Sequence, residues 1–114
     1  TGGRLADRPG YRYAADASGG ADIVVNVTPI GMAGGAEADD LSFAPDVIAK
    51  ARTVFDVVAL PSETPLVRAA RAAGVPVVTG AEVIALQAAE QFERYTGVRP
   101  TAAQVAAASA FSRA

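Results

Sequence analysis

Three short runs of β-branched and apolar residues alternate with helical segments, and this alternation constrains the fold of the chain more than any other feature. The runs cover residues 23–27, 53–60 and 75–78. Continuous apolar runs of this length, bounded by Gly and Pro, are typical of strands buried on both faces of a sheet. Since helical segments and short connections separate the runs, we expect a parallel sheet with right-handed crossovers. The pattern predicts an α/β fold: half of a doubly wound parallel sheet, ending in two helices.

Capping residues indicate where two of the helices begin and end. Ser42 can cap a helix over about 43–51. Thr64 can cap a second helix whose first residue is Pro65, a position at which the missing N–H costs nothing. Gly74 then ends this helix in the left-handed conformation that glycine adopts without strain.

Two further helices begin with capping boxes, in which two side chains each satisfy a free backbone N–H. The boxes are Thr79 with Glu82 and Thr101 with Gln104. The first predicts a long helix that runs to Tyr95 and stops at Gly97, and the second a final helix over 101–114. The apolar residues of the long helix recur at helical spacing: Ile84, Ala88, Phe92 and Tyr95.

The first twenty residues carry the weakest pattern. We expect a poorly defined lead-in over 1–20, with the end of a helix at 4–7 and a short edge strand at 11–15. The first four residues resemble neither a signal peptide nor a natural start, so we expect a piece of a larger protein. Since no linker or repeat divides the chain, residues 1–114 are expected to form one partial domain.

Composition excludes several kinds of chemistry. The chain has no histidine and no cysteine, which excludes Cys/His metal sites, thiol nucleophiles, a Ser-His-Asp triad and disulfides. The only close acidic pair, Asp39-Asp40, lies in a Gly/Ala-rich stretch typical of a solvated turn, so we expect no metal site. A net charge of −2 without a basic stripe argues against a nucleic-acid partner. No run reaches the ~18 apolar residues of a membrane span, and we expect a cytoplasmic protein.

Three loops follow the predicted strands and are the candidate ligand-binding segments, because ligands of open parallel sheets bind beyond the carboxyl ends of the strands. The loops are 28–32, 59–64 and 79–82. Each pattern also suits an ordinary turn or helix cap. Gln87, in the following helix, has the donors and the acceptor needed to recognise a hydroxyl or a carboxylate, although the pattern alone is more typical of a surface or boundary glutamine.

Three segments together resemble the shikimate dehydrogenase family. Residues 26–32 (NVTPIGM) resemble its N-(A/T)-T-P-x-G-M segment. Residues 55–66 resemble D-x-x-Y-x-P-x-x-T-x-L, and residues 80–97 resemble G-x-x-M-L-x-x-Q-A-x-x-Q-F-x-x-x-T-G. The likeness extends over about 22–100, with the segments in the right order and at the right spacing.

The resemblance implies the C-terminal half of a Rossmann-type sheet and a reaction. The family transfers a hydride reversibly between NADP(H) and a ring carbon bearing a hydroxyl, interconverting 3-dehydroshikimate and shikimate. The implied cofactor-binding positions are Val27, Thr28, Val57, Gly80 and Val83. Gln87 matches the glutamine that hydrogen-bonds the substrate, a small cyclic hydroxy acid. NADP is the expected cofactor, with NAD as the alternative.

Two departures from the family pattern leave alternatives open. The family's catalytic Lys and Asp belong to an N-terminal substrate domain, and its glycine-rich phosphate loop is expected upstream of Thr1. We therefore expect no catalytic residue here, no activity and at most weak dinucleotide binding from the fragment alone, and a final helix, 101–114, that packs on the absent domain. Lys50, at the end of a predicted helix, is no substitute for the catalytic lysine.

The second departure is Ala59, which occupies a substrate-binding position where the family usually has Tyr. It leaves open a paralogue acting on quinate or an aminoshikimate. A non-catalytic dinucleotide-binding or interaction module is a further hypothesis. A dehydrogenase of the same half-fold acting on a folate or an aldehyde is another.

Overall fold

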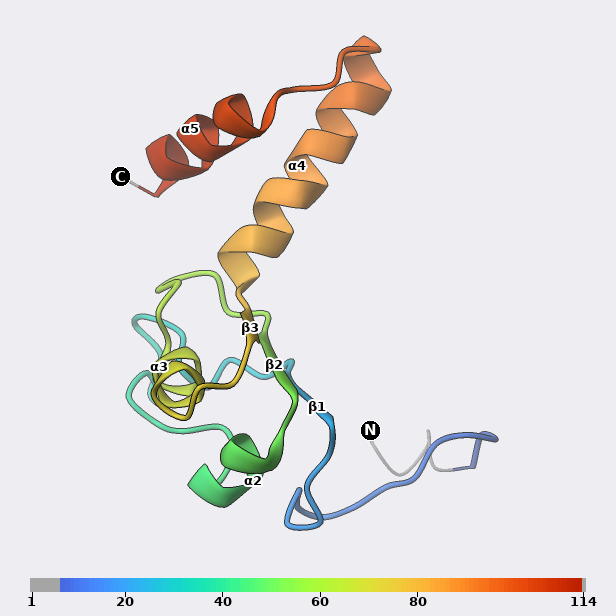
Figure 1. The fold of residues 1–114 in the computed structure, drawn as a ribbon, viewed down its shortest axis with the longest axis vertical. Helices are drawn as coiled ribbons and strands as arrows, with labels where there is room; N and C mark the ends of the chain where they lie inside the picture. The colour runs from blue at the N-terminus through green and yellow to red at the C-terminus, as the bar shows by residue number, and fades with distance from the viewer. Residues whose placement is uncertain (1–6, 114) are drawn as a thin grey trace.

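The structure, a computed structural model, describes residues 7–113 and contains a three-stranded sheet with helices between and after the strands (Figure 1). The strands are β1 (Ile23–Asn26), β2 (Thr53–Asp56) and β3 (Val77–Val78). The helices are α2 (Pro45–Lys50), α3 (Pro65–Ala72), α4 (Gly80–Thr96) and α5 (Ala102–Ser112). Strands and helices therefore follow one another in the expected order.

The sheet is parallel throughout, as predicted. Its strand order is β1-β2-β3, so each strand pairs with the next one along the chain. In the register of the sheet, Val24 lies opposite Val54 and Asn26 opposite Asp56, while Val54 lies opposite Val77. Because all three strands run the same way, their carboxyl ends meet at one edge of the sheet.

All three strands are shorter than predicted: β3 begins later, at Val77, whereas β1 and β2 end earlier, for a reason visible in the side chains that end them. The Thr28 N–H donates to Asn26 Oδ1 (3.0 Å), and the Val58 N–H donates to Asp56 Oδ1 (3.0 Å). Asn and Asp side chains that bond the backbone two residues on form turns in place of a strand ladder. β1 and β2 consequently end at residues 26 and 56.

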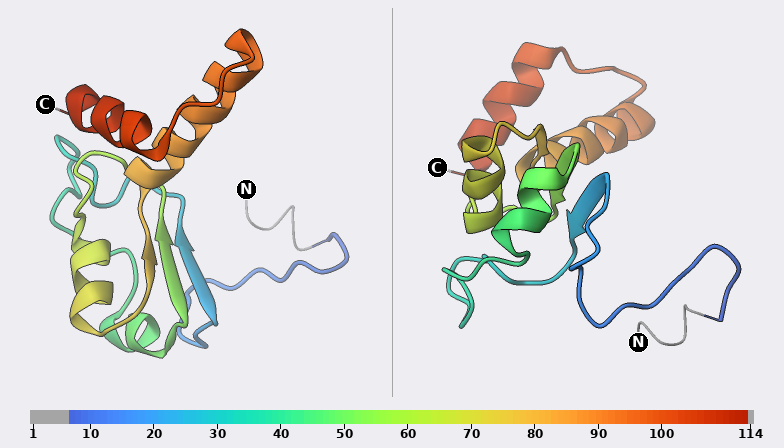
Figure 2. Two further views of the ribbon diagram at one scale, coloured as in Figure 1. Left: turned by 45° about the horizontal axis from the view of Figure 1, so that its top comes forward. Right: turned by 60° about the horizontal axis from the view of Figure 1, so that its bottom comes forward.

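The core lies on one face of the sheet, under α2 and α3 (Figure 2). Its buried members are Val24, Val47, Ile48, Ala51, Val54, Leu66, Ala70 and Val75. The opposite face is open within the described residues, with Ile23 64% and Val25 39% exposed. The expectation of strands buried on both faces is therefore wrong for residues 7–113, because the described helices between the strands cover only one face.

Two predictions about local structure are also wrong. α2 begins at Pro45 rather than at 43, and its N-cap is Ala44 rather than Ser42. Proline holds the residue before it in an extended conformation, which forces the helix to start at the proline. The predicted edge strand at 11–15 is absent, and Tyr11 and Tyr13 are each 59% exposed, with no strand beside them to pair with. The helix end predicted at 4–7 lies outside the described residues except for Asp7.

The remaining caps are confirmed. The Val67 N–H donates to Thr64 Oγ1, and both capping boxes, at Thr79 and Thr101, are complete. Gly97 ends α4 with φ 72°. α4 and α5 extend beyond the carboxyl end of the sheet (Figure 1), and their apolar residues are largely open: Ile84 is 54% exposed.

Candidate functional site

The candidate site is the sheet rim, which we define as residues 26–33, 56–64 and 79–80, where the three strands end. The loops after β1 and β2 bond directly, since the Ala33 N–H donates to the Leu60 carbonyl (2.9 Å). The Val57 N–H donates to the Asn26 carbonyl (3.1 Å). The predicted candidate loops thus come together at one edge of the sheet, as the strand directions require.

A buried pair of polar side chains joins the first two strands at the rim. Asn26 is 1% exposed and Asp56 is fully buried. Asn26 Nδ2 donates to Asp56 Oδ1 (3.1 Å) and to the Ile30 carbonyl (3.1 Å). On its other side, Asn26 Oδ1 accepts from the Thr28 hydroxyl (2.6 Å) and N–H. Each hydrogen-bonding position of this buried amide is therefore used.

The same network reaches the start of α3. Thr64 is fully buried, and its hydroxyl donates to Asp56 Oδ2 (2.6 Å) while accepting from the Val67 N–H (3.1 Å). Gly31 packs over this threonine in a conformation with φ +91°; a Cβ built there would lie 3.3 Å from the Thr64 Cβ. A glycine is thus needed at this position both for its conformation and for the close approach.

Two exposed aliphatic side chains lie on the outer surface of the rim. Val27 is 74% exposed and Val57 is 41% exposed, and both belong to the predicted cofactor-binding set. Thr28 is also exposed, but its hydroxyl is engaged within its own loop by Asn26 and by the Ile30 N–H (3.3 Å). Around Val27 and Val57 the rim therefore presents aliphatic surface outward, while the buried Asn26, Asp56 and Thr64 hold the loops from within.

Gly80 begins α4 against the end of β2. A Cβ at this position would lie 2.5 Å from the Val57 carbonyl oxygen and 2.6 Å from that of Val58. The glycine is buried and lets the helix start in contact with the backbone just after β2. The resemblance implies a cofactor-binding role for Gly80; its packing against the end of β2 is the role visible in the structure, and contact with a cofactor stays a prediction.

Of the remaining predicted residues, the structure places Ala59 in a groove and leaves Gln87 outside it. Val83 is half-buried and Gln87 is exposed, one turn apart on α4. Ala59 lines an apolar groove of about 720 Å³ between α4 and α5. Other residues lining it are Leu60, Ile84, Phe92, Val98 and Val105. The substrate-binding role of Ala59 and Gln87 remains a prediction.

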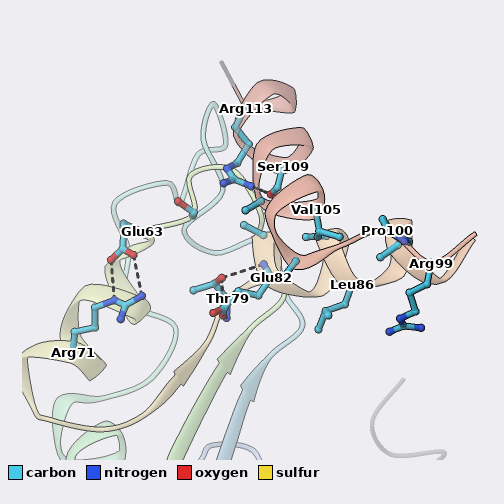
Figure 3. A pocket seen from close by; sticks show the side chains of 16 residues that line it. Glu63, Arg71, Thr79, Glu82, Leu86, Arg99, Pro100, Val105, Ser109 and Arg113 are labelled. Atoms are coloured by element: carbon cyan, nitrogen blue, oxygen red, sulfur yellow. Dashed lines mark hydrogen bonds and ion pairs between the residues drawn. The ribbon is translucent and has the colours of Figure 1, made fainter. Parts of the chain in front are cut away.

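A second, more polar cleft of about 650 Å³ lies where α3, α4 and α5 approach one another (Figure 3). Two of its acidic side chains already have partners: Glu63 pairs with Arg71 at 3.1 Å, and Glu82 accepts from the Thr79 N–H at 2.7 Å. At its edge Arg99 contacts two glutamates at the end of α4, which raises the pKa of its guanidinium. These contacts are local, within one helix and the segment next to it, and they leave none of these charged groups without a partner.

Asp56 and Thr64 are functional candidates that sequence reasoning did not single out. The sequence did hold one signal for Asp56: it is an acidic residue inside an apolar strand. Burial of a carboxylate is costly unless several hydrogen-bond donors compensate it, so such a residue is expected to collect donors.

Within residues 7–113, no cluster of three or more acidic side chains could hold a metal ion. In the same part of the chain, no helix has both the length and the apolar character of a membrane span.

No family model matches the chain, but individual proteins do. A shikimate dehydrogenase-like protein from Haemophilus influenzae is 51% identical over 114 residues, which are 99% of this chain and 42% of the relative. A shikimate dehydrogenase (NADP(+)) from Methanocella arvoryzae is 48% identical over 79 residues, 69% of this chain and 28% of that protein. The chain therefore spans less than half the length of these curated relatives.

Solved structures show the same similarity in three dimensions. That of a shikimate 5-dehydrogenase-like protein superposes with a TM-score of 0.91 at 50% identity, covering 97% of this chain and 42% of that one. That of quinate dehydrogenase from Corynebacterium glutamicum, in complex with NAD, has a TM-score of 0.65 at 36% identity and covers 75% of this chain and 29% of that one.

Proposed function

We propose, from the premise that this chain belongs to the shikimate dehydrogenase-like family of oxidoreductases, that it is the C-terminal, dinucleotide-binding part of such an enzyme. The family and the α/β fold class expected from the sequence are confirmed. The observation that carries the proposal is the sheet rim, at which the three parallel strands end and the first two motif segments bond to each other.

The rim residues fit the nicotinamide end of a dinucleotide. Exposed Val27 and Val57 offer aliphatic surface against which a flat ring can pack. NADP is the proposed cofactor, with NAD as the alternative, and a bound nicotinamide supplies the hydride acceptor. The phosphate contacts are expected from a part of the enzyme outside these 114 residues.

The proposed reaction is the reversible oxidation of shikimate to 3-dehydroshikimate. The ring carbon bearing the hydroxyl loses a hydride to the nicotinamide, and the hydroxyl loses its proton to a base. Gln87 is proposed to orient the substrate by hydrogen bonds. The base is not proposed among these residues: Lys50, the one lysine of the sequence, ends α2 next to the start of β2, at the opposite end of the sheet from the rim. We therefore expect the fragment alone to be inactive.

The test is a steady-state assay of the complete protein with shikimate and quinate, each with NADP and with NAD. We expect turnover of shikimate with NADP, and none by the 114-residue chain alone. Absence of turnover with every pair, despite tight dinucleotide binding, would instead support a non-catalytic binding module. Absence of both binding and turnover would refute the proposal.

A second substrate class, quinate or an aminoshikimate, is favoured by Ala59. A tyrosine hydroxyl at this position would add a substrate hydrogen bond worth roughly 0.5–1.5 kcal/mol. Ala59 is half-buried beside the apolar groove, which leaves room for a larger side chain or a differently substituted ring. Similarity to a quinate dehydrogenase supports the same alternative.

The substitution Ala59→Tyr in the complete protein tests this alternative. If shikimate is the substrate, the new hydroxyl should raise kcat/KM for shikimate roughly two- to tenfold. Ala59→Phe is the matched control, because it adds the ring without the hydroxyl. A fall in activity with both variants, together with faster turnover of quinate by the wild type, would favour the second class.

A further inference from the structure

We propose that Asp56 is a positioning residue for the bound dinucleotide, a role that rests on the proposed function. Asp56 is fully buried and therefore cannot touch a ligand at the outer surface of the rim. Its carboxylate instead holds, from inside, the two backbone segments expected to meet the cofactor.

The first step is that the Asp56 carboxylate accepts hydrogen bonds from three donors. Oδ1 accepts from Asn26 Nδ2 (3.1 Å) and from the Val58 N–H (3.0 Å), and Oδ2 accepts from the Thr64 hydroxyl (2.6 Å). These donors come from three segments: the end of β1, the loop after β2 and the N-cap of α3. One side chain thus sets the relative position of three segments that are separate in sequence.

The second step is the relay through Asn26. While its amide nitrogen donates to Asp56, its oxygen accepts from the N–H and hydroxyl of Thr28. Asp56 therefore acts on residues 27–28 through Asn26 and on residues 57–58 directly. Both segments expose apolar surface outward, at Val27 and Val57, so a shift of either changes the shape offered to a flat ring.

The third step concerns the choice of a carboxylate. Burying a carboxylate costs solvation energy unless several hydrogen-bond donors compensate it, as three donors do at Asp56. A carboxylate can accept several hydrogen bonds at once without donating any. That property suits a position where three donors converge, and a fully connected network of this kind makes a local structure rigid.

The experiment compares Asp56→Asn with the wild type in the complete protein. The amide replaces an acceptor oxygen with a donor group that must face one of the existing donors. We expect the dissociation constant of NADP, measured by titration calorimetry, and the KM for NADP to rise at least tenfold, whereas kcat at saturating NADP falls less. Ile48→Ala, a core substitution in α2 away from the rim, is the control for lost stability and should leave both constants within about twofold.

A second pair of variants keeps the test decisive if Asp56→Asn does not fold. Thr64→Val removes the hydroxyl that donates to Asp56 and should also weaken NADP binding, whereas Thr64→Ser should restore most of the loss. Unchanged NADP binding in Asp56→Asn or Thr64→Val, with a wild type that binds NADP, would overturn the positioning role and leave the proposed function standing. A wild type that binds no dinucleotide would overturn both.

Discussion

Gly80 and Gln87 lie two turns apart on α4, and the structure constrains the first but not the second. Gly80 is constrained by its own chain, because the Val57 and Val58 carbonyls occupy the place where a Cβ would go. Gln87 is exposed, so the described structure places no packing constraint on its side chain. A substitution at the first should change stability, and one at the second should change ligand recognition.

Gly80→Ala is expected to lower the free energy of unfolding by about 1–3 kcal/mol, the usual cost of forcing a methyl group into a packed contact. The new Cβ would meet backbone carbonyls, which cannot rotate away as a side chain can. Urea denaturation of the complete protein measures the change. Gly19→Ala is the control, since a Cβ at Gly19 meets nothing within 4 Å. Equal stability of the two variants would contradict the packing role.

Gln87→Ala is expected to raise the KM for the cyclic substrate roughly two- to tenfold, the loss of one hydrogen bond. The dissociation constant of the dinucleotide should stay unchanged, because the proposed partner of Gln87 is the substrate. Gln91→Ala, one turn further along the same helix, is the matched control. If both variants behave as the wild type, Gln87 has no role in binding the substrate.

At the scale of elements, α4 and α5 begin with the same capping box but are anchored differently. α4 buries Gly80 and Ala81 against the sheet, whereas no residue of α5 is buried within the described part of the chain. A cap stabilises the first turn of its helix, and the rest of the molecule is affected only if packing couples that turn to the core. The two helices should therefore respond differently to loss of the same hydrogen bonds.

Thr79→Ala should lower the free energy of global unfolding by about 1 kcal/mol, because the cap of α4 is coupled to the buried end of β2. Thr101→Ala, the equivalent change in α5, should leave global stability nearly unchanged and increase only the hydrogen exchange of amides in α5. Urea denaturation and hydrogen exchange read by mass spectrometry distinguish the two, both at concentrations of the 114-residue chain below those at which it is expected to self-associate. A similar global loss for both would show that α5 is coupled to the core more firmly than its exposure indicates.

These elements also show how far the sequence could predict the fold. Caps at Thr64, Thr79 and Thr101 depend on residues three positions apart, so a local pattern was sufficient to locate three helices. The start of α2 was misplaced because Ser42 has the right side chain but Pro45 controls the backbone. From the sequence, β1 and β2 were predicted to extend too far toward the C-terminus. These strands stop where the side chains of Asn26 and Asp56 accept from the backbone N–H two residues later, a bond that the apolar pattern does not reveal.

For the whole molecule, the open apolar surface is the dominant property. One face of the sheet exposes Ile23, Val25 and Val27, and the groove between α4 and α5 exposes Ile84 and Phe92. Contiguous exposed apolar surface of this kind marks contacts with other protein segments or promotes association. β1 also lies at the edge of the sheet, where its free side can pair with another strand.

The 114-residue chain expressed alone should therefore bind the dye ANS and self-associate at micromolar concentrations. Gel filtration with light scattering and ANS fluorescence measure these properties. Val25→Thr combined with Phe92→Ser should reduce both signals, because the first change lies on the open sheet face and the second in the groove. A monomeric wild-type chain without ANS fluorescence would contradict this expectation.

By itself, the sequence determined the order and type of the elements, the parallel direction of the strands and the motif residues that identify the family. Each of these depends on residue patterns within a short segment, or on the match of one short segment to a family motif. Only the tertiary structure decided that Asn26, Asp56 and Thr64 form one buried network, and that Gly80 packs against the end of β2. The reason is physical: Asn26 and Asp56 are 30 positions apart, and only the register of two neighbouring strands brings them within hydrogen-bonding distance.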